Sequence, residues 1–320
     1  MITALAGGVG AARLLRGLVR VVPPEEVTAV VNTADDMVYC GLHISPDIDT
    51  VTRTLAGRFN EVKGYGVADD TWTVLSALGQ MGGDTWFELG DQDLATHMFR
   101  SRRLEQGHTL SQVTAELAAA AGLATRLLPV TDDPLRTRVT LRTGQPTGQE
   151  VSFQEYFAKL RHAVPVSSIR FDGADTARPA PGVLDAVDAA DLVVVCPSNP
   201  LLSIDPLLAV AGLRPRLQAR RDRNVAVSPI VGGKAIKGPA DRLLDELGLE
   251  PSAAGVAAYY APWVGTVVID QVDRHLAPEV EALGLRCVVT DTIMATPERS
   301  AALAAAVLRA GGIEPVGQAG

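Results

Sequence analysis

The chain has few cysteines, no long hydrophobic run and no excess of basic residues. Its three cysteines, Cys40, Cys196 and Cys287, are too few and too scattered for a disulfide scaffold, so we expect reduced thiols. No stretch approaches the ~20 apolar residues of a membrane span. The apolar start of the chain also lacks the basic region of a signal peptide. These absences predict a cytoplasmic protein without a membrane segment.

Several function classes are excluded in the same way. A net charge of −8 argues against a nucleic-acid binder, because such a protein needs a basic face. The chain has no Gly-Lys-Ser/Thr phosphate loop, no serine-hydrolase elbow, no His-Glu-x-x-His and no Cys-x-x-Cys.

With 320 residues, of which 47% are hydrophobic and 21% charged, the chain is long and apolar enough to bury a full core.

Short apolar runs that alternate with helical patterns predict an α/β fold, with a Rossmann-like, doubly wound and mostly parallel sheet. The first unit is a strand over 2–6, a glycine turn, a helix over 11–22 and a strand over 27–31. From about residue 180 the alternation returns, with strands at 192–196, 224–227, 267–269 and 287–290 and a closing helix at 297–308. We predict a nucleotide-binding core from 1–50 and 171–310, a mainly helical insertion over 51–170 and a tail over 311–320.

The predicted helices of the insertion cover 50–59, 71–79, 92–105, 110–121 and 153–162, and its two predicted strands cover 125–130 and 137–142. The unusual polar segments of the chain all follow predicted strands. Because ligands of open α/β sheets bind beyond the carboxyl ends of the strands, we treat these segments as parts of one site.

The first such segment is the glycine turn, where Gly7, Gly8 and Gly10 open the first helix. Glycines let backbone N–H groups approach an anion, and the helix N-terminus adds a partial positive charge. The turn therefore predicts a phosphate or diphosphate site, although a tight turn without a ligand fits the same residues. Arg13 stands where a dinucleotide-binding turn has its third glycine, which weakens that interpretation.

Four carboxylates, Asp35, Asp36, Asp47 and Asp49, follow the second strand within fifteen residues. Such hard oxygen ligands suit Mg²⁺, which commonly takes one or two carboxylates plus substrate phosphates. Helix capping by Asp49 or Thr50 and a solvated turn at Asp35 and Asp36 would explain some of these residues but not all four. We therefore favour metal or hydroxyl binding.

Three later segments add weaker signals. Glu88 and Asp91 lie in a stretch that joins aromatic side chains, acids and His97, and Asp91 is also placed to cap the following helix. The Trp86-Phe87 pair fits either a ring-stacking surface or core packing. The other two segments offer hydroxyl, amide and cationic groups at strand ends, which suit a base edge or a diphosphate; they contain Ser198, Asn199, Gly232, Gly233 and Lys234.

Taken in order, these segments resemble the 2-phospho-L-lactate transferase family of coenzyme F-420 biosynthesis. The resemblance covers nearly the whole chain and rests on six ordered motifs, at residues 7–10, 32–36, 45–51, 89–97, 197–200 and 228–233. It implies a Rossmann-like homodimer that requires Mg²⁺. It also implies transfer of a phospho-lactyl or phospho-enolpyruvyl group from a guanosine-diphosphate-linked donor, with release of GMP. The acceptor would be the terminal ribityl hydroxyl of 7,8-didemethyl-8-hydroxy-5-deazariboflavin (Fo).

The resemblance also implies roles for individual residues. Asp49 would contact Fo and orient its hydroxyl or accept its proton, and Asp36 with Asp49 would hold the metal. The glycine turn and Lys234 would neutralise the diphosphate, the Ser198-Asn199 loop would hold the guanosine, and Glu88 would lie near the acceptor. The insertion would then contribute to the acceptor site.

Two other functions compete with this one. Gluconeogenesis-factor proteins, which bind uridine-diphosphate sugars and regulate metabolism without catalysis, also open with a glycine-rich turn. They differ from this chain at Asp35-Asp36-Met37-Val38 and lack the Ser-Pro-Asp-x-Asp-Thr segment. A nicotinamide-dependent oxidoreductase is disfavoured by Arg13. No motif indicates whether the donor carries lactate or enolpyruvate.

Overall fold

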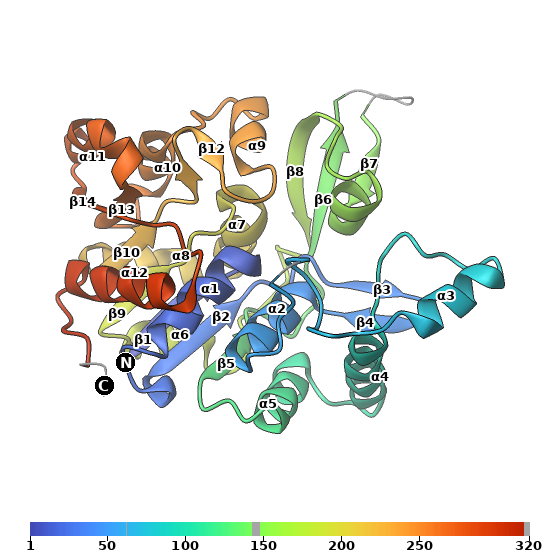
Figure 1. Ribbon diagram of the computed structural model, residues 1–320. Coiled ribbons are helices and arrows are strands. Elements are labelled where there is room, and N and C mark those ends of the chain that lie inside the picture. Colours follow the sequence, from blue (N-terminus) through green and yellow to red (C-terminus); the bar gives the residue numbers. More distant parts are fainter. Residues whose placement is uncertain (62, 143–147, 317–320) are drawn as a thin grey trace.

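The computed structural model describes residues 1–61, 63–142 and 148–316, and its centre is a seven-stranded parallel sheet (Figure 1). The strands follow one another across the sheet as β14 (Arg286–Thr290), β13 (Thr266–Asp270), β10 (Asn224–Val227), β9 (Leu192–Val195), β1 (Ile2–Ala6), β2 (Val27–Val31) and β5 (Arg126–Pro129). The predicted α/β class with a parallel, doubly wound sheet is confirmed.

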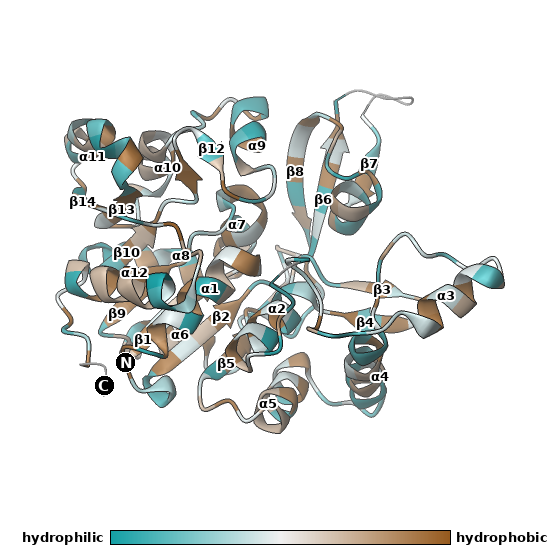
Figure 2. Cartoon of the chain, in the orientation of Figure 1, coloured by the Kyte–Doolittle hydropathy of each residue, from teal (hydrophilic) through white to brown (hydrophobic). Residues whose placement is uncertain are grey.

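Helices cover both faces of this sheet because its central strands are apolar on both sides. In β1, Leu5 belongs to one core cluster and Ala4 with Ala6 to the other, as the twofold repeat of a strand requires. One face is covered by α1 (Gly8–Leu18), α2 (Pro46–Leu55), α5 (Leu110–Ala120) and α12 (Pro297–Ala310). The other is covered by α6 (Val183–Ala189), α7 (Asp205–Ala209), α8 (Leu213–Ala219), α9 (Ala240–Glu246), α10 (Ala253–Tyr260) and α11 (Ala277–Ala282). Figure 2 shows the hydrophobic colour on the strands between these layers.

Two projections lie beside this core (Figure 1). One contains the β3–β4 hairpin with α3 and α4, at Met37–Tyr39, Leu42–Ile44, Thr73–Gln80 and Asp91–Glu105. The other is an antiparallel sheet in the order β7-β6-β8, with β6 at Arg136–Leu141, β7 at Glu150–Ser152 and β8 at Val166–Asp172. A short β11–β12 hairpin, at Ile230–Val231 and Lys234–Ala235, lies on the C-terminal half. Short helical turns occur at Pro24–Glu26, Glu155–Lys159, Pro200–Ile204, Arg221–Arg223 and Gln271–Leu276.

The structure differs from the predicted segments in three places. β5, which was expected inside the insertion, pairs in parallel with β2 and forms the edge of the central sheet. Helix α2 begins at Pro46 instead of Thr50, because proline is well suited to the first turn of a helix. The predicted helix over 153–162 is only a π-helical turn at Glu155–Lys159.

The end of the chain returns to the core, since the Val316 N–H donates to the Val21 carbonyl oxygen at 2.8 Å. The rest of the predicted tail, residues 317–320, lies outside the described residues. Among the helices that the structure describes, none has both the length and the apolar character needed to cross a bilayer.

Candidate functional site

The strand order reverses between β1 and β9, and two of the predicted segments meet there. β1 continues to β2 and β5 on one side, while β9 continues to β10, β13 and β14 on the other. The glycine turn follows β1 and the Pro197–Pro200 loop follows β9, and the Ser198 hydroxyl donates to the Gly7 carbonyl oxygen at 2.8 Å. Such a switch point is where open α/β sheets bind ligands.

Each glycine of the turn has its own structural setting. Gly8 has a φ of +71°, which side chains with a Cβ rarely adopt. Gly10 lies so close to the Pro197 carbonyl oxygen that a Cβ would clash with it. Gly7 precedes α1 and offers no side-chain cap. The first turn of α1 therefore presents backbone N–H groups at the switch point, as an anion site requires.

Three carboxylates gather at this helix N-terminus and are buried there. Asp47, on the first turn of α2, accepts from the Asn32 side-chain amide at 3.0 Å, and the Gly8 N–H also donates to it. Asp35 accepts from the Thr137 hydroxyl at 3.4 Å. Burial raises the pKa of Asp47 to about 7, and burial together with Asp47 and Asp36 raises that of Asp35 well above its ordinary value. The negative charge of Asp35 and Asp47 is therefore disfavoured unless a cation compensates it, as expected for a cation site.

Only one of the two carboxylate oxygens of Asp36 has hydrogen-bond partners among the described residues. The Ser45 hydroxyl donates to its Oδ2 at 2.7 Å, and His43 Nε2 lies 3.1 Å from the same oxygen. Its other oxygen, Oδ1, is buried without a hydrogen-bond partner among the described residues. An oxygen of this kind is costly to bury unless a ligand, a water or a metal ion completes it.

Asp49 belongs to a different cluster, on the opposite side of α2 from Asp47. Both of its oxygens accept from the buried Arg100 guanidinium, and His97 Nδ1 lies 3.6 Å away. Burial would raise the pKa of Asp49, but Arg100, followed by Arg53 and His97, lowers it to about 2. Residues two apart on a helix point in nearly opposite directions. Asp49 thus interacts with Arg100 and His97, whereas Asp36 lies next to Asp35 and Asp47.

Other predicted residues have structural partners. The Asn199 side chain accepts from Leu201 N and Leu202 N, so it caps the turn that follows. Gly232 and Gly233, with φ of +59° and +74°, form the two-residue turn of the β11–β12 hairpin. Lys234 is mostly exposed and pairs with Asp241 at 3.2 Å.

The segment around α4 also departs from the simple capping scheme. Asp91 accepts from Thr73 N and Val74 N and so caps α3 instead of its own helix. Asp70 in turn accepts from Gln92 N, at the start of α4. Glu88 accepts from the Tyr65 hydroxyl at 2.7 Å. Nearby, the rings of Tyr39, Trp86 and Phe87 lie 5.3–5.8 Å apart and pack on one another.

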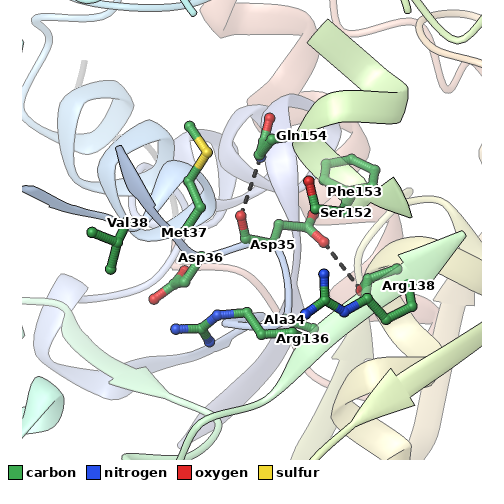
Figure 3. Close-up of a pocket in the computed structure, with 11 residues that line it drawn as sticks. Ala34, Asp35, Asp36, Met37, Val38, Arg136, Arg138, Ser152, Phe153 and Gln154 are labelled. Atoms are coloured by element: carbon green, nitrogen blue, oxygen red, sulfur yellow. Dashed lines mark hydrogen bonds between the residues drawn. The ribbon is translucent and has the colours of Figure 1, made fainter. Parts of the chain in front are cut away.

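A cavity of about 190 Å³ adjoins the carboxylate cluster (Figure 3). It lies between the end of β2 and the β7-β6-β8 sheet, and Asp35, Asp36, Arg136, Thr137 and Phe153 are among its lining residues. Sequence reasoning missed the arginine side of this cavity. Arg136 comes from β6, whose Thr137 N–H donates to the Ala34 carbonyl oxygen at 2.8 Å.

The residues present fit a bound Mg²⁺ only with help from a substrate. Within the described ranges no group of three or more His, Cys, Asp or Glu side chains is arranged to hold a metal ion. Asp36 would supply one carboxylate ligand through its unpartnered Oδ1, and the neighbouring Asp35 or Asp47 would supply a second. Mg²⁺ is commonly bound in this way, with substrate phosphates and water completing its six positions.

Comparison with known proteins places the chain among transferases. The 2-phospho-L-lactate transferase CofD family matches residues 2–307. A protein of Kitasatospora aureofaciens named phosphoenolpyruvate transferase is 43% identical, over 96% of each chain. Proteins with the same name are 42% identical in Streptomyces griseus, over 95% of this chain and 96% of the relative, and 36% in Mycolicibacterium smegmatis, over 98% and 99%.

Among solved structures, a UPF0052 family protein of Bacillus halodurans has a similar fold. The TM-score is 0.60 at 16% sequence identity, and the match covers 96% of this chain and 98% of that one. At this identity the likeness concerns the fold alone.

We predict that Arg100→Met destabilises the protein by about 3–5 kcal/mol, because it leaves the buried Asp49 carboxylate without its main partner. Urea denaturation measures the free energy of unfolding. Arg102→Met is the matched control, since Arg102 pairs with Glu105 at the surface and is 70% exposed. Equal stability of the two variants would contradict the structural role of the Asp49–Arg100 pair.

We also predict that Asp47→Asn changes the pH dependence of stability. Because the folded-state pKa of Asp47 is raised to about 7, the folded protein binds more protons than the unfolded chain between about pH 4 and 7. The contribution of Asp47 to wild-type stability therefore falls as the pH rises through this range. Asp47→Asn should lack this contribution. The difference in unfolding free energy between variant and wild type should therefore shift in favour of the variant from pH 5 to pH 8, by on the order of 1 kcal/mol or more. Asp222→Asn, an exposed control, should keep the wild-type slope, and an unchanged slope in Asp47→Asn would refute the prediction.

Proposed function

Since this chain belongs to the 2-phospho-L-lactate transferase CofD family, and is thereby a transferase of coenzyme F-420 biosynthesis, we propose that it acts on Fo. It transfers a phospho-enolpyruvyl or phospho-lactyl group from a guanosine-diphosphate-linked donor to the terminal ribityl hydroxyl and releases GMP. The names of the relatives favour the enolpyruvyl donor. The observation that carries the proposal is the bare Asp36 Oδ1 beside two further buried carboxylates at the N-terminus of α1.

The switch point suits the donor. The N–H groups of the first turn of α1 bind its diphosphate, and the loop at Ser198 and Asn199 lies directly beside Gly7, where the guanosine half would extend. Asp47 now accepts from the Gly8 N–H. The donor diphosphate would therefore compete with the Asp47 carboxylate for the Gly8 N–H.

Magnesium would neutralise the diphosphate charge, which is its usual contribution to phosphoryl transfer. Asp36, with Asp35 or Asp47, would hold it. Where Asp35 and Asp47 hold the metal, Asp36 Oδ1 is free to accept the proton of the attacking Fo hydroxyl or to orient that hydroxyl. We assign this role to Asp36 in place of Asp49, because Arg100 occupies both oxygens of Asp49 and a pKa of about 2 makes that carboxylate a poor base.

The acceptor ring fits the side of the insertion. Tyr39, Trp86 and Phe87 form a partly exposed aromatic cluster near the β3–β4 hairpin, and Glu88 follows it in the chain. Phosphoryl transfer of this type depends mainly on positioning and charge neutralisation. The proposal also places the enzyme in the cytoplasm, which agrees with its three unpaired cysteines.

The proposed activity is tested by incubating the protein with Fo, Mg²⁺ and each donor and by determining the molecular mass of the product. Asp36→Asn should lower the transfer rate at least ~10²-fold, the usual effect of a lost proton acceptor or metal ligand, and should leave thermal unfolding intact. Asp222→Asn, at an exposed position, should match the wild type. Removing Mg²⁺ with a chelator should stop the reaction.

Binding titrations distinguish the rival functions. Fo should bind, whereas NAD and a uridine-diphosphate sugar should not. Binding of the sugar nucleotide without Fo would favour a non-enzymatic regulator, and binding of NAD would favour an oxidoreductase.

We further propose that the protein is a homodimer joined through α3 and the neighbouring face of α4. Helix α3 has eight residues, none of them buried, and isolated helices this short do not persist in water. Large apolar side chains are exposed on both helices and at their ends, at Val74, Met81, Met98 and Phe99. A second copy of the chain, packing in a twofold manner, would cover this surface.

For this interface we predict that Met98→Glu converts a dimer into a monomer in light scattering coupled to size exclusion. Leu283→Glu also adds a carboxylate at an exposed leucine, but at the end of α11, which lies across the core from α3 and α4 (Figure 1), so this variant should stay dimeric. A wild type that is monomeric at every concentration tested would disprove the homodimer.

A further inference from the structure

The cavity beside Asp35 and Asp36 contains a cationic group that the proposed mechanism does not use. Two arginines of β6, Arg136 and Arg138, line it together with the two aspartates. Figure 3 shows the Arg136 side chain extending along the cavity toward Asp36. In a chain with a net charge of −8, such a guanidinium beside two acids needs an explanation.

The two arginines differ in their partners. Arg138 donates from Nε to the Asp172 carboxylate at 3.0 Å, so its charge is already compensated. Arg136 donates from Nη1 only to the carbonyl oxygen of the preceding Leu135, at 2.6 Å. Within the ranges that the structure describes, no carboxylate forms an ion pair with Arg136. Its planar guanidinium is therefore available to an anion in the cavity.

The chain of contacts shows where this cavity lies relative to the reacting groups. Gly8 contacts Asp47, Asp47 and Asp35 interact, and Asp35 contacts Thr137, the neighbour of Arg136 on β6. The Gln154 side chain also donates to the Asp35 carbonyl oxygen at 3.2 Å. The cavity is lined by Asp35 and Asp36 but by neither Asp47 nor the glycine turn, so it adjoins the carboxylate cluster at the end farther from that turn.

The part of the donor that extends in this direction is the three-carbon acid on the transferred phosphate. The guanosine lies on the other side of the diphosphate in the proposed arrangement. The cavity, of about 190 Å³, is large enough for the three-carbon acid, because cavities of ~150 Å³ in proteins hold a benzene molecule.

We propose that Arg136 binds the carboxylate of the three-carbon acid of the donor and so makes the enzyme specific for carboxylated donors. The inference rests on the proposed function. A carboxylate beside Asp35 and Asp36 would be repelled without a compensating cation, and a paired guanidinium–carboxylate contact supplies that cation with fixed geometry. Lactate and enolpyruvate both carry a carboxylate. The subsite therefore recognises the charge that they share and does not distinguish the saturated from the unsaturated acid.

The test compares the donor with its carboxamide, in wild type and in Arg136→Gln. Wild type should prefer the carboxylate donor, and Arg136→Gln should lose about tenfold to hundredfold in kcat/KM for that donor. For the carboxamide donor, the kcat/KM of Arg136→Gln should fall only slightly, and the KM of this variant for Fo should not change. The dissociation constant of the donor, measured by calorimetry without Fo, should rise by a similar factor. Arg136→Lys should recover part of the loss.

Arg178→Gln is the matched control, because Arg178 is 86% exposed and lies outside the cavity lining; it should match the wild type. Equal thermal unfolding of wild type and Arg136→Gln shows that the change is local. If Arg136→Gln keeps wild-type affinity for the carboxylate donor, or loses equally with both donors, the subsite is refuted. If the wild type binds no guanosine-linked donor and transfers nothing to Fo, the proposed function itself fails.

Discussion

The site depends on the close approach of three carboxylates to the N-terminus of α1. Asp35, Asp36 and Asp47 are each no more than 8% exposed, and loss of hydration together with repulsion from neighbouring acids disfavours the charged state of Asp35 and Asp47. The fold offsets this cost with directed donors: the Gly8 N–H, the Asn32 amide, the Ser45 hydroxyl and the Thr137 hydroxyl. One oxygen, Asp36 Oδ1, receives no hydrogen bond from the residues that the structure describes. Such a concentration of negative charge beside a helix N-terminus is suited to a divalent cation and a diphosphate together.

A second cluster of buried charges has the opposite electrostatic character and a structural role. Asp49 is neutralised by Arg100, and Arg53 forms a further pair with Asp93 of α4. Burial lowers the pKa of His97 to about 4, so this ring is neutral at neutral pH. The cluster ties α4 to α2, and α2 carries Asp47. The ion pairs of one face of α2 therefore fix the position of the acid on its other face.

The sequence predicted much of this arrangement from local patterns. The glycine turn, the apolar strands and the polar residues that follow them lie where the βα alternation indicated, and Ser198 does contact the turn. Asp35, Asp36 and Asp47 were all recognised as part of one acidic segment. The assignment of Asp36 and Asp49 to one metal site followed from the family resemblance and not from the predicted helix bounds. With the helix beginning at Pro46, the spacing of two residues separates Asp47 from Asp49 on the helix surface.

The sequence alone determined the α/β class, the switch-point glycines and the acids after the second strand, because these follow from periodicity and backbone sterics within a few residues. Only the tertiary structure decided which carboxylates are free. The partners of Asp49 and Asp36 come from α4 and β4, and the Arg136 cavity forms because β6 pairs with the backbone after Ala34. Contacts between residues 51 or more than 100 positions apart, such as Asp49 with Arg100 and Asp35 with Thr137, leave no local trace in the sequence. They are set by the packing of whole elements, and that packing determines which of several similar acids keeps an oxygen available for chemistry.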